Sequence, residues 1–560
     1  MKTIPFSILN REDALQTVRT NTFDLVIIGG GVTGAGIALD AASRGLQVCL
    51  IEKNDFASGT SNKSTKLIHG GLRYLKQLEI GLVRESGTER AIVHKLAPHL
   101  VIPEKMLLPL VEDGTYGKMM TSIGLKVYDF LASVEGDDRR KMLDKEETLN
   151  KEPLLDSKTI LGSGYYSEYR TDDARLTIEL LKKASEYGAT ILNYCEMQSF
   201  IYNANKKLIS IDCFDFLTEK SINIKSNAFV SATGPWVDKL REKDASKENK
   251  YLHLTKGVHI VFPFSKFPLK QSIYFDVADG RMIFAIPRGR ATYVGTTDTN
   301  YFGNLEHVIA TKADANYLLN AINAAFPEIN LSINDIESNW AGLRPLIHEE
   351  EKDPSELSRK DEIFISNSGL ISIAGGKLTG YRKMAQRVID VVLKTKPSNK
   401  ITALKESFTD KITLTTKGFN ATKEVEIFKN NLQVKLNKLG FTGSYYSWYL
   451  TTTYGKQATI IIKNLSLFNN SDIETQLIRA ELWYGIHYEM VNSLSDFFVR
   501  RTGRLYFNIS SVTTFRDIIL EDCKQYLNWN APRVLKENKA LDLLIKDATH
   551  FYKTDNVSLY

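Results

Sequence analysis

The sequence has few cysteines, and none is arranged for metal binding or for a disulfide framework. Its four cysteines are widely scattered and include no CxxC pair, and no His cluster has metal-ligand spacing. Neither a disulfide-stapled fold nor a zinc or iron–sulfur site is therefore expected, and we expect no bound metal. This cysteine usage indicates a reducing compartment.

The sequence also has no apolar run that could cross a bilayer, which takes roughly 18 residues. The N-terminal stretch MKTIPFSILNREDALQTVRTNTF carries early acidic residues and lacks the apolar core of a signal peptide. Membrane contact is therefore expected only at the periphery. One candidate is the stretch 116–134, whose apolar residues recur at helical spacing between lysines. A helix that packs on the core is the simpler interpretation of that pattern.

Strong charge of one sign is absent as well. The 72 basic residues are nearly balanced by 66 acidic ones, which gives a net charge of +6 and a pI near 8.7. A nucleic-acid binder would show a stronger basic bias, so no nucleic-acid partner is expected. The small surplus suits an anionic substrate or weak attraction to anionic lipid.

The length and composition are those of a folded chain with more than one unit. A chain of 560 residues is too long for one hydrophobic core, and 43% hydrophobic with 25% charged residues is ordinary for globular proteins. Strands alternate with helices until about Lys394, where TKPSNK resembles a linker and mostly helical sequence follows. We therefore expect an α/β domain over 1–394 and a C-terminal helical domain over 395–560.

A dinucleotide-binding βαβ unit is predicted at the start of the chain. The apolar strand FDLVII leads into GGGVTG, which fits GxGxxG, and an Ala-rich helix and a strand ending at Glu52 follow. Gly29 permits the tight turn, Gly31 lets a pyrophosphate approach, and Gly34 lets the helix pack on the strand. Glu52 is placed to accept the ribose hydroxyls. A glycine turn without ligand is the plain alternative.

Three further features favour FAD over NAD. A hydroxyl-rich loop follows Glu52 and runs into a Gly-Gly pair, an Ala-Thr-Gly turn ends the strand before Gly234, and a third glycine turn precedes a helix at Gly376. Three glycine turns in this order can hold one flavin from both ends. The predicted cofactor-binding residues are Gly29, Gly31, Gly34, Glu52, Thr60, Ser61, Lys66, Leu67, His69, Gly234, Gly376, Lys377, Leu378 and Thr379.

Several long segments together carry a family resemblance. They are SxxSTKLIHGGLRYL, DDARL (172–176), ATGPW, KGVHIVFP, VGTTDT, GLRPL, IAGGKLTGYRKMA, AEL-x-Y (480–484) and RRT (500–502). Through them essentially the whole chain resembles the FAD-dependent glycerol-3-phosphate dehydrogenases of the bacterial aerobic and mitochondrial type. Two positions depart from the family pattern: Gly380 stands where a second Thr is usual, and Asn62-Lys63 where Ser-Ser or Ser-Arg is commoner. The chain lacks an EF-hand pattern and a transit peptide, so it resembles a bacterial member.

The resemblance implies an FAD-binding Rossmann-like domain interleaved with a mixed α+β substrate domain, plus a C-terminal all-helical cap. It implies oxidation of sn-glycerol 3-phosphate to dihydroxyacetone phosphate by hydride transfer to FAD, with electrons passed to a membrane quinone. It also implies a cytoplasmic enzyme with peripheral lipid contact at the inner face of the cytoplasmic membrane, and it allows a homodimer. The alternative is a glycerol-3-phosphate oxidase that makes hydrogen peroxide, although such oxidases often carry an inserted segment for which this length leaves little room.

The reaction sets the residue roles. A dianionic phosphate favours bidentate Arg, for which we select Arg73 and Arg344, and alcohol oxidation needs a base, for which His259 leads and His69 is second. Lys377 is placed to stabilise negative charge on the reduced flavin. The predicted catalytic residues are thus His259, Arg344 and Lys377, and the predicted substrate-binding residues are Arg73, Arg344, His69 and His259. Structural ion pairs, a core histidine and a solvent-facing lysine are the alternatives.

Two other classes share such a flavin fold. An amine or amino-acid oxidase would need a carboxylate site in place of a phosphate site, and it would lack the helical cap. A flavoprotein without enzymatic activity is disfavoured because Arg73, His259, Arg344 and Lys377 occur together.

Overall fold

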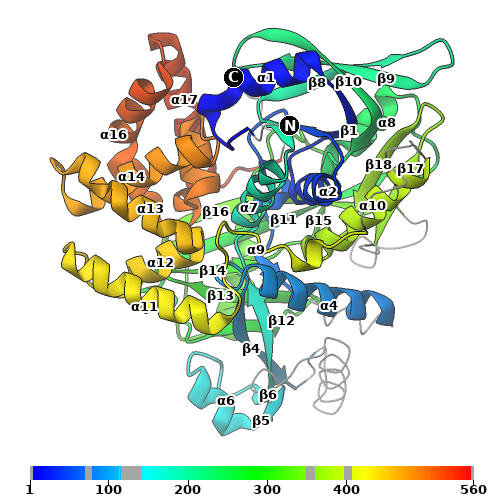
Figure 1. Ribbon diagram of the computed structural model, residues 1–560. Coiled ribbons are helices and arrows are strands. Elements are labelled where there is room, and N and C mark those ends of the chain that lie inside the picture. Colours follow the sequence, from blue (N-terminus) through cyan, green and yellow to red (C-terminus); the bar gives the residue numbers. More distant parts are fainter. Residues whose placement is uncertain are drawn as a thin grey trace.

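The computed structural model describes residues 4–69, 79–112, 114, 140–348, 360–395 and 406–555. Two sequence predictions lie outside these residues: Arg73 as a phosphate ligand and the amphipathic stretch 116–134. In the described ranges the strands form two sheets with helices around them (Figure 1). No helix within those ranges is both long and apolar enough to cross a membrane.

The first sheet has the strand order β17-β18-β10-β1-β2-β7, in which the strands from β18 to β7 are parallel and β17 is antiparallel to β18; β9 pairs with β10, and β8 pairs with β9. Its central strands are apolar runs that are buried, as expected where helices cover a parallel sheet. Its strands are β1 (Thr22–Ile28), β2 (Val48–Ile51), β7 (Thr190–Leu192), β8 (Cys195–Tyr202), β9 (Leu208–Asp215), β10 (Lys220–Ser231), β17 (Asp361–Ile365) and β18 (Leu370–Gly375).

The second sheet is mostly antiparallel, in the order β15-β11-β14-β13-β12-β4-β6-β3, with β16 paired to β11 and β5 to β6. The long pairing of β11 with β16 sets side chains from distant parts of the sequence next to each other. Its strands are β3 (Leu67–Ile68), β4 (Ile102–Val111), β5 (Lys141–Leu143), β6 (Ile160–Arg170), β11 (Leu252–Pro263), β12 (Ser272–Asp276), β13 (Met282–Arg288), β14 (Ala291–Gly295), β15 (Thr299–Asn300) and β16 (Ser338–Ile347).

Helices pack on the sheets and form a layer of their own. In the first 395 residues they are α1 (Arg11–Thr20), α2 (Val32–Ser43), α4 (Ile80–Leu96), α6 (Lys145–Lys151), α7 (Asp173–Glu186), α8 (Val237–Lys243), α9 (Lys312–Ala325) and α10 (Tyr381–Thr395). The later ones are α11 (Thr422–Lys438), α12 (Tyr445–Tyr454), α13 (Ala458–Lys463), α14 (Ile473–Tyr488), the π-helix η11 (Asp496–Arg501), α15 (Arg504–Phe507), α16 (Ile509–Leu527) and α17 (Ala531–Thr549). Figure 1 shows this helical layer, coloured yellow to red, along one side of the molecule.

The predicted βαβ unit and fold class are confirmed. The strand FDLVII is β1, the Ala-rich helix is α2 and the strand ending before Glu52 is β2, in parallel register with β1. The described residues 406–555 are helical wherever they form regular structure, apart from an isolated bridge at Tyr552. The helices α15 and α17 contact β16, so the helical layer is packed against the second sheet. The division after residue 394 stays a prediction.

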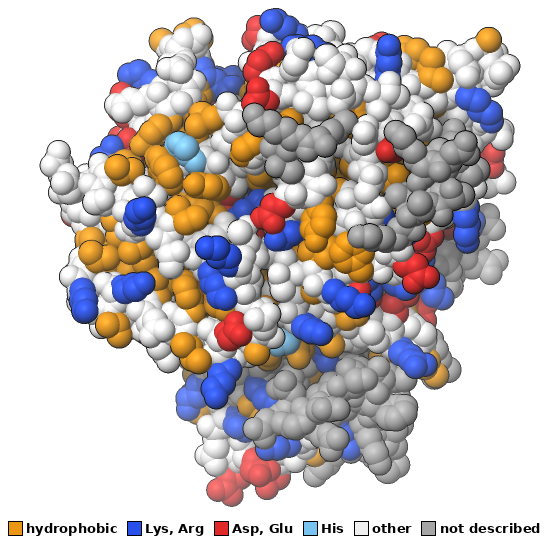
Figure 2. Space-filling model, in the orientation of Figure 1, with side chains coloured by type: hydrophobic (Ala, Val, Ile, Leu, Met, Phe, Trp, Pro, Cys, Tyr) orange, Lys and Arg blue, Asp and Glu red, His pale blue; other side chains and the backbone are white. Residues whose placement is uncertain are grey.

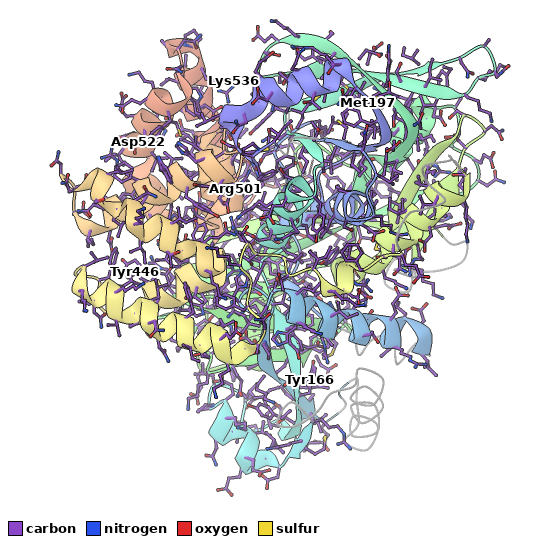
Figure 3. All side chains as sticks on the ribbon, in the orientation of Figure 1. Tyr166, Met197, Tyr446, Arg501, Asp522 and Lys536 are labelled. Atoms are coloured by element: carbon purple, nitrogen blue, oxygen red, sulfur yellow. The ribbon has the colours of Figure 1, made fainter. Side chains whose placement is uncertain are left out.

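A buried network of charges joins the helical layer to the sheets. We call it the charged seam, and it comprises Asp55, Arg175, Glu179, Lys182, Glu489, Asp496, Arg500 and Arg501. Arg501 Nη1 and Nη2 donate to the two carboxylate oxygens of Asp55 at 2.7 and 2.8 Å. Arg175 makes the same bidentate contact with Glu489 at 2.6 and 2.7 Å. Figure 3 shows Arg501 between the helical layer and the central helices.

Two carboxylates of the seam are kept ionised by their cationic partners, whereas burial and then the charge of Asp55 raise the pKa of Asp496. Burial alone would raise the pKa of Asp55, but Arg501 and Arg500 outweigh it and lower this pKa to about 2. Burial likewise opposes ionisation of Glu489, yet Arg175 and Lys182 lower its pKa to about 2. Because such pairs are desolvated, removing one member leaves its partner as an uncompensated buried charge.

Candidate active site

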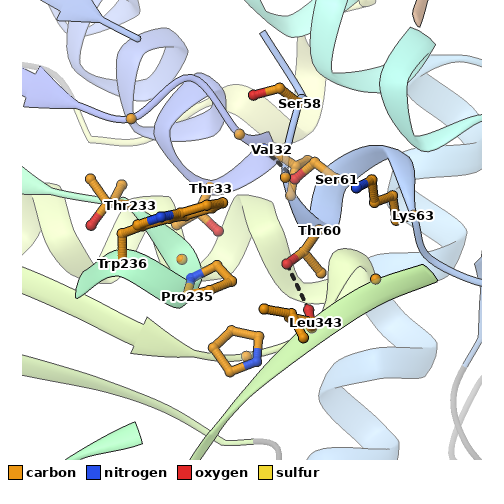
Figure 4. Close-up of a pocket in the computed structure, with 18 of the residues that line it drawn as sticks. Val32, Thr33, Ser58, Thr60, Ser61, Lys63, Thr233, Pro235, Trp236 and Leu343 are labelled. Atoms are coloured by element: carbon orange, nitrogen blue, oxygen red, sulfur yellow. Dashed lines mark hydrogen bonds between the residues drawn. The ribbon is translucent and has the colours of Figure 1, made fainter. Parts of the chain in front are cut away.

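A cavity of about 380 Å³ lies where the two sheets meet. The three glycine turns line it: the turn after β1 at Gly29 and Gly31, the turn after β10 at Gly234, and the turn after β18 at Gly376. In Figure 4, Thr60 and Ser61 lie on one side of the cavity and Trp236 lies on the other. Segments that are far apart in the sequence therefore surround one space, as the prediction of a flavin held from both ends requires.

The first glycine turn has the shape of a dinucleotide cradle. An added Cβ at Gly29, where φ is +114°, would lie 2.6 Å from the Ala232 carbonyl oxygen, and one at Gly34 would collide with the Gly29 carbonyl. At Gly31 the nearest atom to an added Cβ is Ser61 Oγ at 3.2 Å, so close packing within the chain does not demand glycine there. Gly31 lines the cavity and begins α2, whose N-terminus attracts phosphate. The residues present therefore fit a bound pyrophosphate.

The loop after β2 is tied to this cradle. Ser61 Oγ accepts a hydrogen bond from the Val32 N–H at 2.9 Å, and Thr60 Oγ1 donates to the Leu343 carbonyl at 2.7 Å. Glu52 Oε2 accepts from the Gly30 N–H at 2.7 Å, and burial raises the pKa of this carboxyl. Glu52 thus fixes the glycine turn and also lines the cavity at the end of β2.

His259, on β11, is buried and also lines the cavity. Its ring stacks on Trp340 at 4.7 Å between centroids, and Nε2 lies 3.0 Å from Thr65 Oγ1. Nδ1 is buried and has no hydrogen-bond partner among the described residues. Burial, followed by the charges of Arg344 and Lys66, holds the pKa of His259 well below its usual value, so the ring is neutral at neutral pH.

Arg344, on β16, is opposite Thr255 of β11 in the antiparallel register, and its guanidinium lies over Gly257, near enough for its charge to act on His259. Its Nη2 donates to Thr296 Oγ1 at 2.9 Å, and its Nη1 lies 3.3 Å from Asp298 Oδ1. Glycines make room for both side chains. A Cβ at Gly257 would overlap the Arg344 guanidinium, and a Cβ at Gly295 would overlap the His259 ring.

The third glycine turn brings Lys377 to the cavity, followed by Leu378 and Thr379 of a short 3-10 helix. Thr379 Oγ1 exchanges hydrogen bonds with the backbone of His69, at 3.2 Å to its N–H and to its carbonyl. Gly380, where the family usually has Thr, does not belong to the described cavity lining, and the nearest atom to an added Cβ is Glu85 Oε1 at 3.9 Å. That departure therefore falls outside the cavity.

Most predicted site residues lie together. Those that line the cavity are Gly29, Gly31, Glu52, Thr60, Ser61, Leu67, His69, Gly234, His259, Arg344, Gly376, Lys377, Leu378 and Thr379. Gly34 does not line it but packs against Gly29. Lys66 does not line it either: its Nζ is buried and donates to Asp173 Oδ1 at 2.5 Å and to the Asn62 carbonyl at 3.0 Å. Its role in cofactor binding stays a prediction.

Some cavity residues were not assigned from the sequence. Lys63 lines the cavity, and burial, followed by the charge of Arg500, lowers its pKa to about 8. Trp236 lines it too, with Nε1 donating to Glu306 Oε1 at 2.6 Å. Lys63 had been noted only as a departure from the family pattern, and Trp236 only as part of ATGPW. The space-making role of Gly257 depends on strand register, which no local sequence signal reveals.

Comparison with family models divides the chain into two parts. Residues 24–382 match a model described as FAD dependent oxidoreductase. Residues 421–534 match a model described as the C-terminal domain of alpha-glycerophosphate oxidase. The first match includes all three glycine turns, and the second covers much of the helical layer.

Known proteins match over nearly the whole chain. An aerobic glycerol-3-phosphate dehydrogenase of Bacillus subtilis (strain 168) is 48% identical, over 97% of this chain and 98% of that protein. One of Staphylococcus aureus (strain MRSA252) is 47% identical with the same coverage. Among solved structures, the glycerol-3-phosphate dehydrogenase from Bacillus halodurans complexed with FAD has a TM-score of 0.83 at 40% identity, covering 99% of this chain and 100% of that one.

A more distant structure shows the fold alone. The L-alpha-glycerophosphate oxidase of Mycoplasma pneumoniae, solved with FAD bound, has a TM-score of 0.54 at 18% identity and covers 67% of this chain and 95% of its own. The shape of the glycine cradle, the two family models and the relatives that match over nearly the whole chain all indicate the same family. The chain therefore belongs to the FAD dependent oxidoreductase family and, within it, to the aerobic glycerol-3-phosphate dehydrogenases, with FAD as its cofactor.

Proposed function

We propose that this protein oxidises sn-glycerol 3-phosphate to dihydroxyacetone phosphate and passes the electrons to a membrane quinone. FAD, when bound, supplies the acceptor for the hydride that leaves C2. The observation that carries the proposal is the pairing of a neutral, buried histidine with an arginine in the flavin cavity, His259 beside Arg344. The relatives that match over 97% of the chain are named aerobic glycerol-3-phosphate dehydrogenases, which supports the substrate.

His259 acts in this proposal as the base for the substrate hydroxyl. A general base must be unprotonated at the working pH, and the lowered pKa of His259 meets that need. Nδ1 makes no hydrogen bond to any described residue, while Nε2 lies beside Thr65, so one ring nitrogen is left to take the proton. A dianionic substrate near Arg344 would offset the positive charge that helps to depress this pKa. Substrate binding would thereby strengthen the base.

Arg344 holds the substrate's phosphate. Its guanidinium already contacts Thr296 and Asp298, which fix its position, and the 3.3 Å contact with Asp298 is longer than a strong charge-assisted hydrogen bond. Arg73 is proposed as the second phosphate ligand on sequence grounds. Lys377 follows the glycine turn that lines the same cavity, and it supplies positive charge toward the flavin.

The surface of the helical layer supports peripheral contact with lipid. Figure 2 shows hydrophobic side chains gathered over this side of the molecule, with lysines and arginines among them. Exposed apolar residues of this part of the chain are Ile427, Val434, Leu439, Leu467 and Leu535, each between 43 and 57% exposed. An apolar surface edged with basic residues suits the headgroup region of an anionic membrane. On this support we propose peripheral binding at the inner face of the cytoplasmic membrane.

Steady-state assays test the substrate and the acceptor separately. The purified enzyme is expected to oxidise glycerol 3-phosphate and to leave free glycerol untouched, because glycerol offers no charge to Arg344. It is expected to reduce a soluble quinone analogue faster than it consumes oxygen. The family model for the helical region is named after an oxidase, so the helical layer does not decide the acceptor. Fast oxygen uptake with stoichiometric peroxide and no quinone reduction would make the protein an oxidase.

A further inference from the structure

A second cavity, of about 450 Å³, lies between the second sheet and the helical layer. Its lining is rich in arginine and aromatic residues and poor in acidic ones. The charged residues that line it are Arg170, Arg175, Arg288, Arg290, Arg501 and Arg504 on the basic side, and Asp172 and Glu474 on the acidic side. The proposed function uses none of these side chains.

Two of the arginines flank the tight turn between β13 and β14, on either side of Gly289. Arg288 Nη2 donates to Asp172 Oδ2 at 2.7 Å, but its Nη1 is buried and has no hydrogen-bond partner in the described part of the chain. Arg290 is exposed, and its Nη1 donates to Asn508 at 2.5 Å. No carboxylate of the described residues forms an ion pair with Arg290. The turn therefore offers positive charge that the protein only partly balances.

The other arginines are paired from outside the cavity. Arg170 contacts Glu104 and Arg504 contacts Glu481, at 2.6 and 2.7 Å, and neither glutamate lines the cavity. These pairs hold the guanidinium groups in place while the cavity itself contains little negative charge. Arg504 Nε is also buried without a partner among the described atoms. Fixed, partly unsatisfied guanidinium groups are suited to an anion with several oxygen acceptors.

Aromatic rings cover the same turn. The rings of Tyr445 and Trp448 on α12 pack so closely on Gly289 that an added Cβ there would lie 2.9 Å from Trp448. The guanidinium of Arg170 lies 5.6 Å from the Trp448 ring, and that of Arg288 lies 4.2 Å from the Phe507 ring. Such stacking immobilises the arginines and lowers the local dielectric, which strengthens attraction to an anion.

Three sequence segments that lie outside the flavin cavity meet here. Asp172 and Arg175 belong to DDARL, and Arg501 and Thr502 belong to RRT; all four line the second cavity. Glu481, in AEL-x-Y, holds Arg504. The segments that carry the family resemblance therefore line or support two cavities, and only one of these cavities is assigned to the flavin.

We propose that the second cavity binds a small phosphate monoester at the Arg288–Arg290 turn, separately from the flavin cavity. A phosphate dianion has enough acceptor oxygens for the unsatisfied donors and the charge to balance the turn, whereas a neutral ring compound would leave both unmet. The aromatic side chains favour a phosphate that carries a planar group. This inference goes beyond the proposed function and does not depend on it.

The test measures binding through Trp448, which lies in the cavity. Tryptophan fluorescence of the holoenzyme is followed during titration with inorganic phosphate and with AMP, at constant ionic strength because exposed charges are screened by salt. Saturable quenching is expected with both probes, and AMP is expected to bind more tightly because its base can stack. The variant Arg290→Gln is expected to weaken binding at least ten-fold, since it removes a charge that has no ion-pair partner. Arg19→Gln, at an exposed position of α1, is the matched control and should bind like the wild type.

The flavin cavity also contains a tryptophan, Trp236, and predicted phosphate ligands. A second variant is therefore needed to show which cavity produces the fluorescence change. The variant Trp448→Phe should lose the phosphate-dependent quenching while its flavin absorbance and melting temperature stay unchanged. Three results would overturn the proposal: quenching that does not saturate, equal affinity in the Arg290→Gln and Arg19→Gln variants, or full quenching in Trp448→Phe. The last would move phosphate binding to the flavin cavity. Turnover of glycerol 3-phosphate is a separate measurement, so failure of this site and failure of the proposed function are distinguishable.

Discussion

The charged seam and the flavin cavity both bury titratable groups, but they treat them in opposite ways. In the seam, Asp55 and Glu489 each meet two cationic side chains, and their pKa values are lowered to about 2. In the cavity, His259 keeps a ring nitrogen without a partner among the described residues, and its pKa is held down by burial and by like charge. The paired charges of the seam hold the helical layer against the rest of the protein. A ring nitrogen without a hydrogen-bond partner beside a cavity is available for chemistry. It lowers the stability of the fold, and interactions elsewhere in the protein offset that loss.

The largest expected effect comes from removing the unsatisfied group. His259→Asn is expected to lower the rate of flavin reduction by roughly 10²–10⁴-fold, the usual range for loss of a general base. Stopped-flow single turnover at saturating glycerol 3-phosphate measures it, with bound flavin checked by absorbance. His550→Asn, at an exposed position after α17, is the control. An unchanged rate across pH would give His259 a packing role and leave His69 as the next candidate for the base.

Removing a charge from the seam should lower the stability of the protein and leave the rate of flavin reduction of the folded protein unchanged. Asp55→Asn removes the carboxylate partner of Arg501 and leaves Arg500 paired with Asp496 alone, which is expected to lower the free energy of unfolding by about 3–5 kcal/mol. Urea denaturation provides the measurement. Asp517→Asn, whose side chain is 94% exposed, should change little. If the folded fraction of Asp55→Asn reduced its flavin much more slowly than the wild type, the seam and the cavity would not be separable.

A single methyl group should disturb the cavity without touching the seam. Gly257→Ala places a Cβ on the Arg344 guanidinium, so the arginine must move, and a displacement of this kind costs roughly 10²-fold in kcat/KM. Gly81→Ala is the matched control, because an added Cβ there meets nothing within 4 Å. Kinetics with glycerol 3-phosphate and thermal melting are compared for both. An unimpaired Gly257→Ala enzyme would mean that Arg344 does not need its present position.

The last expected effect is a pH dependence of stability at the edge of the seam, which is small near neutral pH and grows as the pH falls. Burial, followed by the charges of Arg175 and Lys182, lowers the pKa of His99 from 6.5 to about 3. Between those values the unfolded chain binds a proton that the folded chain does not. The free energy of unfolding therefore falls as the pH falls below 6.5, by up to about 1.4 kcal/mol per pH unit from this group.

The same stability curve for His99→Asn should be flatter between pH 6.5 and 4 than that of the wild type. Both are followed by urea denaturation at fixed ionic strength. Equal slopes would show that His99 is not the group that takes up this proton.

The flavin cradle could be predicted from the sequence because its signal is local. The strand, the glycine turn, the helix and Glu52 follow one another within about thirty residues, the usual span of a βαβ unit. Gly29 and Gly34 have a steric reason within the chain, and with Gly31 they lie in one short motif. The later turns at Gly234 and Gly376 could be recognised in the same way.

The arrangement around the substrate could not be predicted so well, because it depends on pairing between distant segments. The Arg344 guanidinium lies over Gly257, near His259, because β11 pairs with β16, a strand far along the chain. Lys66, which the loop pattern assigned to the cofactor, forms a buried ion pair with Asp173 at the start of α7. A lysine in a polar loop gives no local sign of such a partner.

The aromatic rings that pack behind His259 have a consequence for folding during translation. Trp340 stacks on that histidine, and its other neighbours include Tyr506 and Phe507 of α15, with ring centroids 5.2 and 5.7 Å away. Translation reaches α15 long after the three glycine turns have left the ribosome. A nascent chain can therefore complete its dinucleotide cradle before the aromatic rings that support His259 have been synthesised. We expect ribosome-stalled chains that end before Tyr506 to capture flavin and to turn over poorly, so activity marks the completion of synthesis.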